Sequence, residues 1–186
     1  EKLCKAGFRQ KLDEFFKSKQ IYLIKNIPSG AGLGGASSDA SAFLTLINKE
    51  LNLNLKSDEL LKISATIGAD VSFFTSSLQS ANVSGFGEIL NAFDDEIPSL
   101  ELLLSSVFCS TPKVYMAYDA NNFHKDINLA KFLSTKTSTQ ILNNYQNYEL
   151  NDLLAPALTL YPNLQISDDE FLSGSGSAKF KLKDKK

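Results

Sequence analysis

The sequence predicts a protein of mixed α and β structure that is divided into two domains. An apolar, β-prone segment at 21–24 leads into a glycine-rich turn, and a helical pattern follows directly. A second glycine–serine turn lies inside an expected hairpin at 172–182. Between these turns, the acidic stretch 94–96 followed by Pro98 has the composition of a linker. We therefore expect one domain at 1–95 and another at 96–186.

The first domain is expected to combine helices with short strands. Leu3, Phe8 and Leu12 belong to an apolar stripe at helical spacing near the start of the chain. Ser57 is a suitable N-cap for a later helix, which Gly68 ends. The elements predicted here are a helix at 1–18, a strand at 21–26, helices at 38–50 and 57–67, and either a strand pair or a bulged strand at 80–90.

The second domain is expected to begin with a strand and to end with a hairpin. The apolar run 100–109 predicts a buried strand. Thr111 can cap the following helix, with Pro112 at its first position. The remaining elements predicted are helical stretches at 126–134, 137–146 and 151–161, and the hairpin at 172–182.

Composition and charge exclude several classes of protein. The chain has 186 residues, of which 43% are hydrophobic and 22% charged, so it can bury a sizeable core. Its net charge of −2 offers no basic excess for nucleic acid, and no apolar run is long enough to cross a bilayer. Cys4 and Cys109 lie far apart, and no histidine–cysteine cluster suits zinc. We expect both cysteines to be reduced core residues of a cytoplasmic protein, and the sequence gives no indication of its oligomeric state.

The glycine-rich turn carries the strongest indication of function. Four glycines fall within six residues, and a helix begins beside them. Glycine lets a backbone approach a ligand closely, and the free N–H groups of a helix N-terminus attract an anion. This density of glycines favours a phosphate site over the alternative, a flexible connection. The turn matches neither the Walker A motif nor the dinucleotide pattern GxGxxG. The candidate phosphate-binding residues are Pro28, Ser29, Gly30, Ala31, Gly32, Leu33, Gly34, Gly35, Ala36, Ser37 and Ser38.

Motifs along most of the chain resemble the GHMP kinase superfamily. PSGAGLGGASSDA at 28–40 looks like the superfamily's second motif, and KNIP at 25–28 and SSDA at 37–40 are most similar to the 4-diphosphocytidyl-2-C-methyl-D-erythritol kinases within it. Ala36 stands where these kinases usually have a third consecutive glycine, and Ser72 where they usually have proline. Further matches, in the family's order, are GADVSFF at 68–74, GFGEIL at 85–90, Asn151–Asp152–Leu153 and LSGSGSAKF at 172–180.

The resemblance implies a fold and an activity. The fold is α+β with two domains, one like ribosomal protein S5 domain 2 and one ferredoxin-like. The activity is transfer of the γ-phosphate of ATP to the 2-hydroxyl of 4-diphosphocytidyl-2-C-methyl-D-erythritol, in non-mevalonate isoprenoid biosynthesis. The resemblance also implies an earlier segment with a catalytic lysine and the cytidine contacts, so we expect a truncated chain that is inactive alone. The alternatives are a homoserine or mevalonate type of GHMP kinase, or, for this fragment alone, a non-catalytic nucleotide-binding module.

The resemblance assigns roles to single residues, each of which has a simpler alternative. Asp70 becomes the catalytic base that takes or orients the alcohol proton, although its spacing equally predicts a helix N-cap. Phosphoryl transfer needs neutralised phosphate charge, which backbone amides at 34–37 and Mg²⁺ would supply. Ser37 or Ser38 is the nearest hydroxyl for phosphate or metal, and each could instead be an N-cap. Lys25 lies beside the adenine in the resemblance, or is a solvated lysine at a strand end.

The second glycine–serine turn resembles the third GHMP motif. In the resemblance this turn closes against the phosphate loop, whereas alone it could be an ordinary flexible hairpin. Its residues are Gly174, Ser175, Gly176 and Ser177. Asn151 and Asp152 are expected to cap a helix rather than to bind a ligand.

Overall fold

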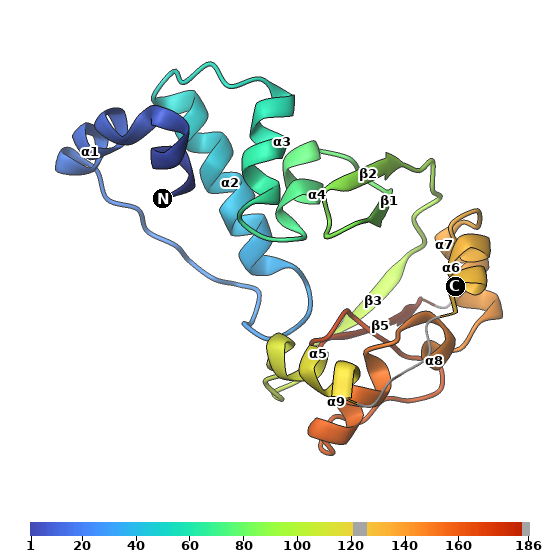
Figure 1. Cartoon of the computed structure of the whole chain (residues 1–186). Coiled ribbons are helices and arrows are strands. Elements are labelled where there is room, and N and C mark those ends of the chain that lie inside the picture. Colours follow the sequence, from blue (N-terminus) through green and yellow to red (C-terminus); the bar gives the residue numbers. More distant parts are fainter. Residues whose placement is uncertain (121–125, 184–186) are drawn as a thin grey trace. The chain divides into compact units, whose positions relative to one another are not determined.

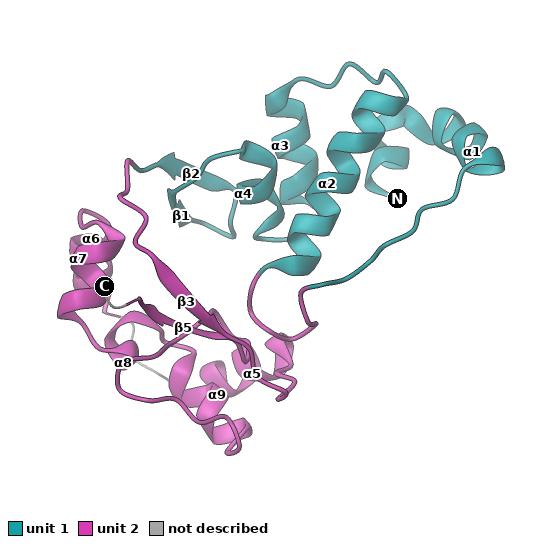
Figure 2. Cartoon of the chain, turned by 180° about the vertical axis from the view of Figure 1, so that it is seen from behind, with its two compact units in different colours: residues 1–26, 34–93 teal, residues 27–33, 94–186 magenta. Residues whose placement is uncertain are grey.

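The computed structural model describes residues 1–120 and 126–183, which form two compact units (Figure 2). Unit 1 contains Glu1–Asn26 and Gly34–Phe93, and unit 2 contains Ile27–Leu33 and the chain from Asp94 onward. The first part of the glycine-rich turn therefore belongs to unit 2, whereas the division expected from the sequence places it in the first domain. Among the described residues, no helix has the length and apolar character needed to cross a membrane.

Unit 1 begins with a helix that is broken near its start. The π-helical turn η1 (Cys4–Phe8) contains Gly7, whose φ of 93° is left-handed, and α1 (Arg9–Ser18) follows it (Figure 1). The continuous helix expected at 1–18 is thus interrupted at Gly7. The apolar stripe is nevertheless used, because it packs against later helices in a cluster of Leu3, Leu12, Leu44, Ile47 and Leu53.

Three further helices and a hairpin complete unit 1. Helix α4 packs against both α2 and α3. The N-cap of α3 is Lys56 rather than Ser57, and the Lys56 N–H donates to the Glu59 carboxylate over 2.9 Å. The strand pair predicted near 80–90 is confirmed as an antiparallel hairpin. The bounds are α2 (Gly35–Glu50), α3 (Ser57–Ala65), α4 (Val71–Ser76), β1 (Ala81–Ser84) and β2 (Ile89–Ala92).

The strand predicted at 21–26 is wrong. This segment is extended coil, and its apolar side chains are exposed, with Tyr22 and Ile24 each 84% accessible. Among the described strands, none pairs with it. Strand residues are stabilised by a hydrogen-bonded neighbour and by burial, so β propensity alone does not make a strand.

Unit 2 contains antiparallel strands in the order β3–β5–β4. Strand β5 (Lys179–Leu182) pairs with β3 (Leu100–Leu103) on one side and β4 (Phe171–Leu172) on the other. Together β4 and β5 confirm the hairpin predicted at 172–182. The helices of this unit are α5 (Thr111–Ala120), α6 (Ile127–Leu133), α7 (Ser138–Asn144), α8 (Asn147–Leu150) and α9 (Leu154–Leu160).

The core of unit 2 lies between α5, α9 and the hairpin. Helices α5 and α9 pack together, and apolar residues from both meet side chains from the loops and β4. Cys109, Val114 and Ala157 are completely buried there. The helix expected at 151–161 is found as α9, which begins three residues later at Leu154, because Asn151 adopts an extended conformation (φ −135°, ψ 99°).

The buried strand predicted at 100–109 is also wrong in part. Strand β3 ends at Leu103, and Leu102 is 51% exposed on it. After the strand, the Ser105 hydroxyl accepts a hydrogen bond from the Val107 N–H at 3.1 Å. Such a local side-chain bond competes with a strand ladder, which explains why the strand is short.

Candidate functional site

The two glycine-containing turns are in direct contact within unit 2. The carbonyl of Gly30 accepts from the Ser177 N–H over 3.1 Å, and that of Ala31 accepts from the Ala178 N–H over 2.9 Å. The Ser173 hydroxyl donates to the Gly32 carbonyl over 2.8 Å. The first half of the glycine-rich turn is therefore held by the second turn, 141 residues later in the chain.

Glycine is required at this contact because the two backbones approach closely. A Cβ atom on Gly32 would lie 2.0 Å from the Ser173 carbonyl oxygen, and one on Gly176 would lie 1.9 Å from the Gly32 nitrogen. Gly30 and Gly32 also have left-handed φ values of 75° and 74°. These glycines serve backbone packing, while Pro28 and Ser29 before them are exposed.

The serines of the second turn point into the protein. Ser175 and Ser177 are 6% and 2% exposed. The Ser175 hydroxyl donates to the Thr111 hydroxyl over 2.9 Å, which attaches the turn to the start of α5. Gly174, by contrast, is exposed and has a φ of 55°. The turn is thus a packed element rather than a flexible hairpin.

The second half of the glycine-rich turn forms the N-terminus of α2. Gly34 occupies the N-cap position with a left-handed φ of 64°, and it has no side chain to cap the helix. The Ser38 N–H donates to the Gly34 carbonyl, so the N–H groups of Gly35, Ala36 and Ser37 precede the helical ladder. The first turn carries no acidic side chain. This helix end can therefore accept an anion such as phosphate.

Three sequence expectations change at this helix end. Helix α2 begins at Gly35, three residues before the predicted start. Neither Ser37 nor Ser38 is the N-cap, so the simpler role considered for these serines is wrong. Ala36 lies inside the helix and has no positive φ, so alanine is accommodated without backbone strain. Leu33, just before Gly34, is half-buried.

Lys25 forms an ion pair with Asp39. Its Nζ lies 2.8 Å from the Asp39 carboxylate on α2, and both side chains are about one third exposed. Lys25 is thus neither at a strand end nor without a partner. The pair places a lysine beside the helix that carries the candidate phosphate site, and its contact with adenine remains a prediction.

Asp70 lies at the N-cap position of α4, yet its carboxylate makes no capping hydrogen bond to this helix. The side chain is exposed. The backbone around it is fixed, since a Cβ on Gly87 would lie 2.1 Å from the carbonyl oxygen of Ala69. Helix α4 is in turn attached to α2 by a hydrogen bond of 3.0 Å from Thr75 to Ser41. The geometry provides an accessible carboxylate on a well-supported backbone.

Two residues with clear contacts to the site were missed by sequence reasoning. Ser173 binds Gly32 directly, and its position next to the glycine–serine turn was the available indication. The ring of Phe74 would lie 2.9 Å from a Cβ on Gly34, so it closes one side of the α2 N-cap. Phe74 is part of the apolar pattern after Asp70, which gives no sign of this contact.

Comparisons with known proteins identify relatives of this chain. Residues 2–78 match the family model of the GHMP kinases N terminal domain. A protein from Campylobacter jejuni, named 4-diphosphocytidyl-2-C-methyl-D-erythritol kinase, is 44% identical over 184 residues, which cover 97% of this chain and 72% of the relative. A protein of the same name from a Sulfurovum species is 42% identical, over 94% of this chain and 70% of its own length.

A solved structure has the same fold. The crystal structure of a 4-(cytidine 5'-diphospho)-2C-methyl-D-erythritol kinase superposes with a TM-score of 0.65 at 28% sequence identity. The match covers 95% of this chain and 68% of that one. The predicted α+β GHMP kinase fold is thereby confirmed.

Proposed function

Because the chain belongs to the 4-diphosphocytidyl-2-C-methyl-D-erythritol kinase family, we propose that it transfers the γ-phosphate of ATP to the 2-hydroxyl of 4-diphosphocytidyl-2-C-methyl-D-erythritol. The product is the phosphorylated alcohol, and ADP leaves. With ATP as the phosphoryl donor, we place this activity in the cytoplasm.

The uncapped N-terminus of α2 is the observation that carries the proposal. Gly34 leaves the N–H groups of Gly35, Ala36 and Ser37 without a side-chain acceptor, at the positive end of a 16-residue helix. Phosphate oxygens are suitable acceptors for these groups. We assign this helix end to the phosphates of ATP, and the packed residues 30–32 to holding the loop in shape.

Asp70 is the proposed acceptor of the proton in the reaction. As the 2-hydroxyl oxygen bonds to the γ-phosphorus, the bond from that phosphorus to the β,γ-bridging oxygen breaks, and the hydroxyl proton passes to the Asp70 carboxylate. An exposed carboxylate on a fixed backbone suits this task. Lys25 is proposed to lie beside the adenine while paired with Asp39.

Mg²⁺ is the proposed metal partner of ATP. Within residues 1–120 and 126–183, no group of three His, Cys, Asp or Glu side chains could hold a metal ion. In proteins, Mg²⁺ usually binds phosphate oxygens, water and one or two protein oxygens. The hydroxyl of Ser37 or Ser38 would supply such an oxygen. Bound Mg²⁺ neutralises charge on the phosphates.

The activity is tested by ATP consumption in the full-length protein. Turnover with 4-diphosphocytidyl-2-C-methyl-D-erythritol is expected, and turnover of homoserine or mevalonate instead would move the protein to another GHMP kinase type. ATP binding without any turnover would support the nucleotide-binding module.

Asp70→Asn tests the catalytic assignment. The amide keeps the shape but cannot take the proton, so we expect kcat to fall by about 10² to 10⁴-fold with ATP affinity little changed. Asp58→Asn is the control, because Asp58 is also an exposed aspartate at the beginning of a helix in unit 1 and should leave kcat unchanged. Near-normal turnover in folded Asp70→Asn would refute the assignment.

A further inference from the structure

We propose that Asn151 is a positioning residue for ATP, because its side-chain amide holds the second turn, residues 173–178, in the conformation that supports the phosphate loop. Asn151 has no role in the function proposed above, and it was expected to be a simple helix cap. The inference rests on that function in so far as the ligand of the loop is ATP.

The side chain of Asn151 bridges two parts of the backbone. Its Nδ2 donates to the carbonyl of Leu172 over 3.1 Å and to that of Gly174 over 2.9 Å. Its Oδ1 accepts from the N–H of Leu153 over 2.9 Å. Both amide hydrogens and the amide oxygen are therefore used. Aspartate would offer no donor to the two carbonyls, so the site is specific for an amide.

The Asn151 contact is made at the point where the second turn begins. Gly174 has a left-handed φ of 55°, which glycine adopts about as readily as a negative φ, so its own backbone does not fix the turn and the hydrogen bond from Asn151 can do so. The residue before it, Ser173, donates to Gly32, and Ser177 after it donates to Gly30. Hydrogen bonds therefore run from Asn151 through the turn to residues 30–32, two residues before the N-cap of α2.

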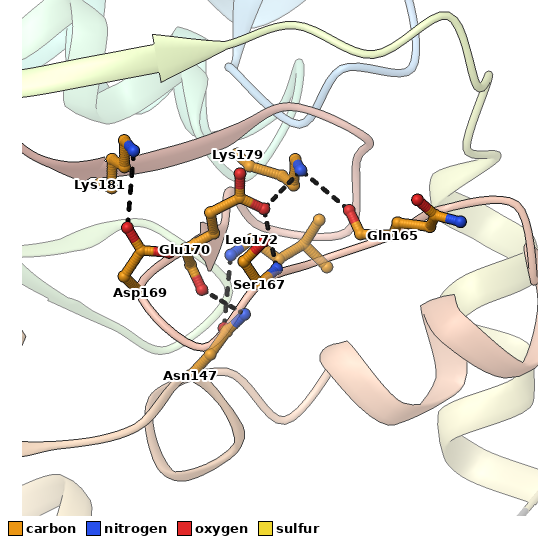
Figure 3. Close-up of polar contacts among 8 residues, drawn as sticks. All are labelled: Asn147, Gln165, Ser167, Asp169, Glu170, Leu172, Lys179 and Lys181. Carbon is orange, nitrogen blue, oxygen red and sulfur yellow. Dashed lines mark hydrogen bonds and ion pairs between the residues drawn. The ribbon is translucent and has the colours of Figure 1, made fainter.

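Asn147, one helical turn earlier, provides a matched comparison. Its Nδ2 donates to the Glu170 carbonyl over 3.2 Å, and its Oδ1 accepts from the Leu172 N–H over 3.3 Å (Figure 3). Beside it, the Glu170 carboxylate pairs with Lys179 over 2.5 Å. Asn147 thus supports strand β4 with two side-chain bonds, as Asn151 supports the turn, but neither of these two bonds reaches a residue of 173–178.

The experiment compares Asn151→Ala with Asn147→Ala in the full-length protein. Both variants should have a lower melting temperature. Of these two variants, only Asn151→Ala should raise KM for ATP. The expected rise is about five- to tenfold if one net hydrogen bond is lost from the support of the loop. Its kcat and its KM for the alcohol should change less than about twofold. Ser173→Ala, which removes one hydroxyl from the same support, should raise KM for ATP in the same direction and covers the case in which Asn151→Ala does not fold.

Two outcomes would overturn the proposal. One is an unchanged KM for ATP in Asn151→Ala, and the other is an equal rise in Asn147→Ala, which would show general loss of stability. If the wild type does not bind ATP, the proposed function fails, and the support is then tested by amide hydrogen exchange. Faster exchange at the Ser177 and Ala178 amides in Asn151→Ala, but not in Asn147→Ala, is the expected result, and equal exchange contradicts it.

Discussion

Gly32→Ala is expected to be among the most disruptive single-methyl additions to the chain. The new Cβ would lie 2.0 Å from the Ser173 carbonyl oxygen and 2.6 Å from the Gly176 nitrogen, both backbone atoms that cannot rotate away. The φ of 74° at this residue adds strain for any side chain. The loop at 30–32 would have to leave the second turn to relieve the contact.

The magnitude follows from the contacts that would be lost. Separation breaks the hydrogen bonds of Ser177 to Gly30, Ala178 to Ala31 and Ser173 to Gly32, worth roughly 1 kcal/mol each. If position 32 retains its left-handed φ after this separation, strain adds about 1–2 kcal/mol. We expect the free energy of unfolding to fall by about 3–5 kcal/mol, with loss of ATP binding. These contacts all lie in unit 2.

Gly174→Ala is the matched control in the same turn. Its φ of 55° gives the same kind of strain, but the nearest atom to a new Cβ is the Gly32 carbonyl oxygen at 3.4 Å, an ordinary contact. We expect a loss of about 1–2 kcal/mol here.

Urea denaturation followed by tyrosine fluorescence is the assay for both variants. It reports on unit 2, because Tyr22 is the sole tyrosine of the sequence outside the residues of that unit. If the two variants unfold within about 1 kcal/mol of each other, the close approach of the two turns is wrong.

Three further predictions address other parts of the molecule. Gly34→Val should weaken ATP binding at least tenfold, because the new Cβ would lie 2.9 Å from the Phe74 ring and the φ of Gly34 is 64°. Unchanged ATP affinity in a calorimetric titration would mean that the loop is purely structural. Ser72→Ala should raise the free energy of unfolding by about 1 kcal/mol, since the Ser72 hydroxyl is buried without a hydrogen-bond partner among the described residues. Clear destabilisation of the variant on urea denaturation would contradict this, because it would show that the hydroxyl has a hydrogen-bond partner. Burial raises the pKa of Glu170, but hydrogen bonds from Lys179 and a backbone N–H outweigh this effect and leave the pKa lowered. The ionised Glu170 carboxylate therefore stabilises the folded protein above about pH 4.5, and this stabilisation is lost as the pH falls through the lowered pKa. The stability difference between wild type and Glu170→Gln should accordingly shrink between pH 7 and about pH 3, and a constant difference contradicts this reasoning.

Local patterns predicted the elements that depend on neighbours in sequence. The helix after the glycine-rich turn and the hairpin at 172–182 could be read from periodicity and turn residues, since both are stabilised by contacts close in the chain. The structure of segment 21–26 could not be predicted in this way. Its apolar residues form a strand only beside a partner strand, and the local sequence does not encode whether one is present. Strand β3 was misjudged for a similar reason, as an apolar run does not show how much of it will be covered.

The candidate site divides in the same way. Gly30 and Gly32 could be recognised as unusual, but the sequence predicted close approach to a ligand, whereas a Cβ on either residue would collide with other parts of the protein. That Asn151 reaches Gly174 could not be read from the chain, because the bond joins residues 23 apart and depends on the extended conformation of Asn151 after α8. Non-local amide contacts of this kind leave no periodic pattern in a sequence.

The pairing of residues 30–32 with the second turn also sets an order of events during synthesis. Gly30 and Ser177 are separated by 147 residues, so the ribosome must add these residues after Gly30 before the pair can form. At about 5–20 residues per second, this takes roughly 7–30 seconds, during which the early loop has no partner. Closing so long a segment also carries an entropic penalty that the later hairpin has to overcome. The contact that holds the glycine-rich turn should therefore form late, and a ribosome-bound chain that stops before β4 should hold its helices without binding ATP.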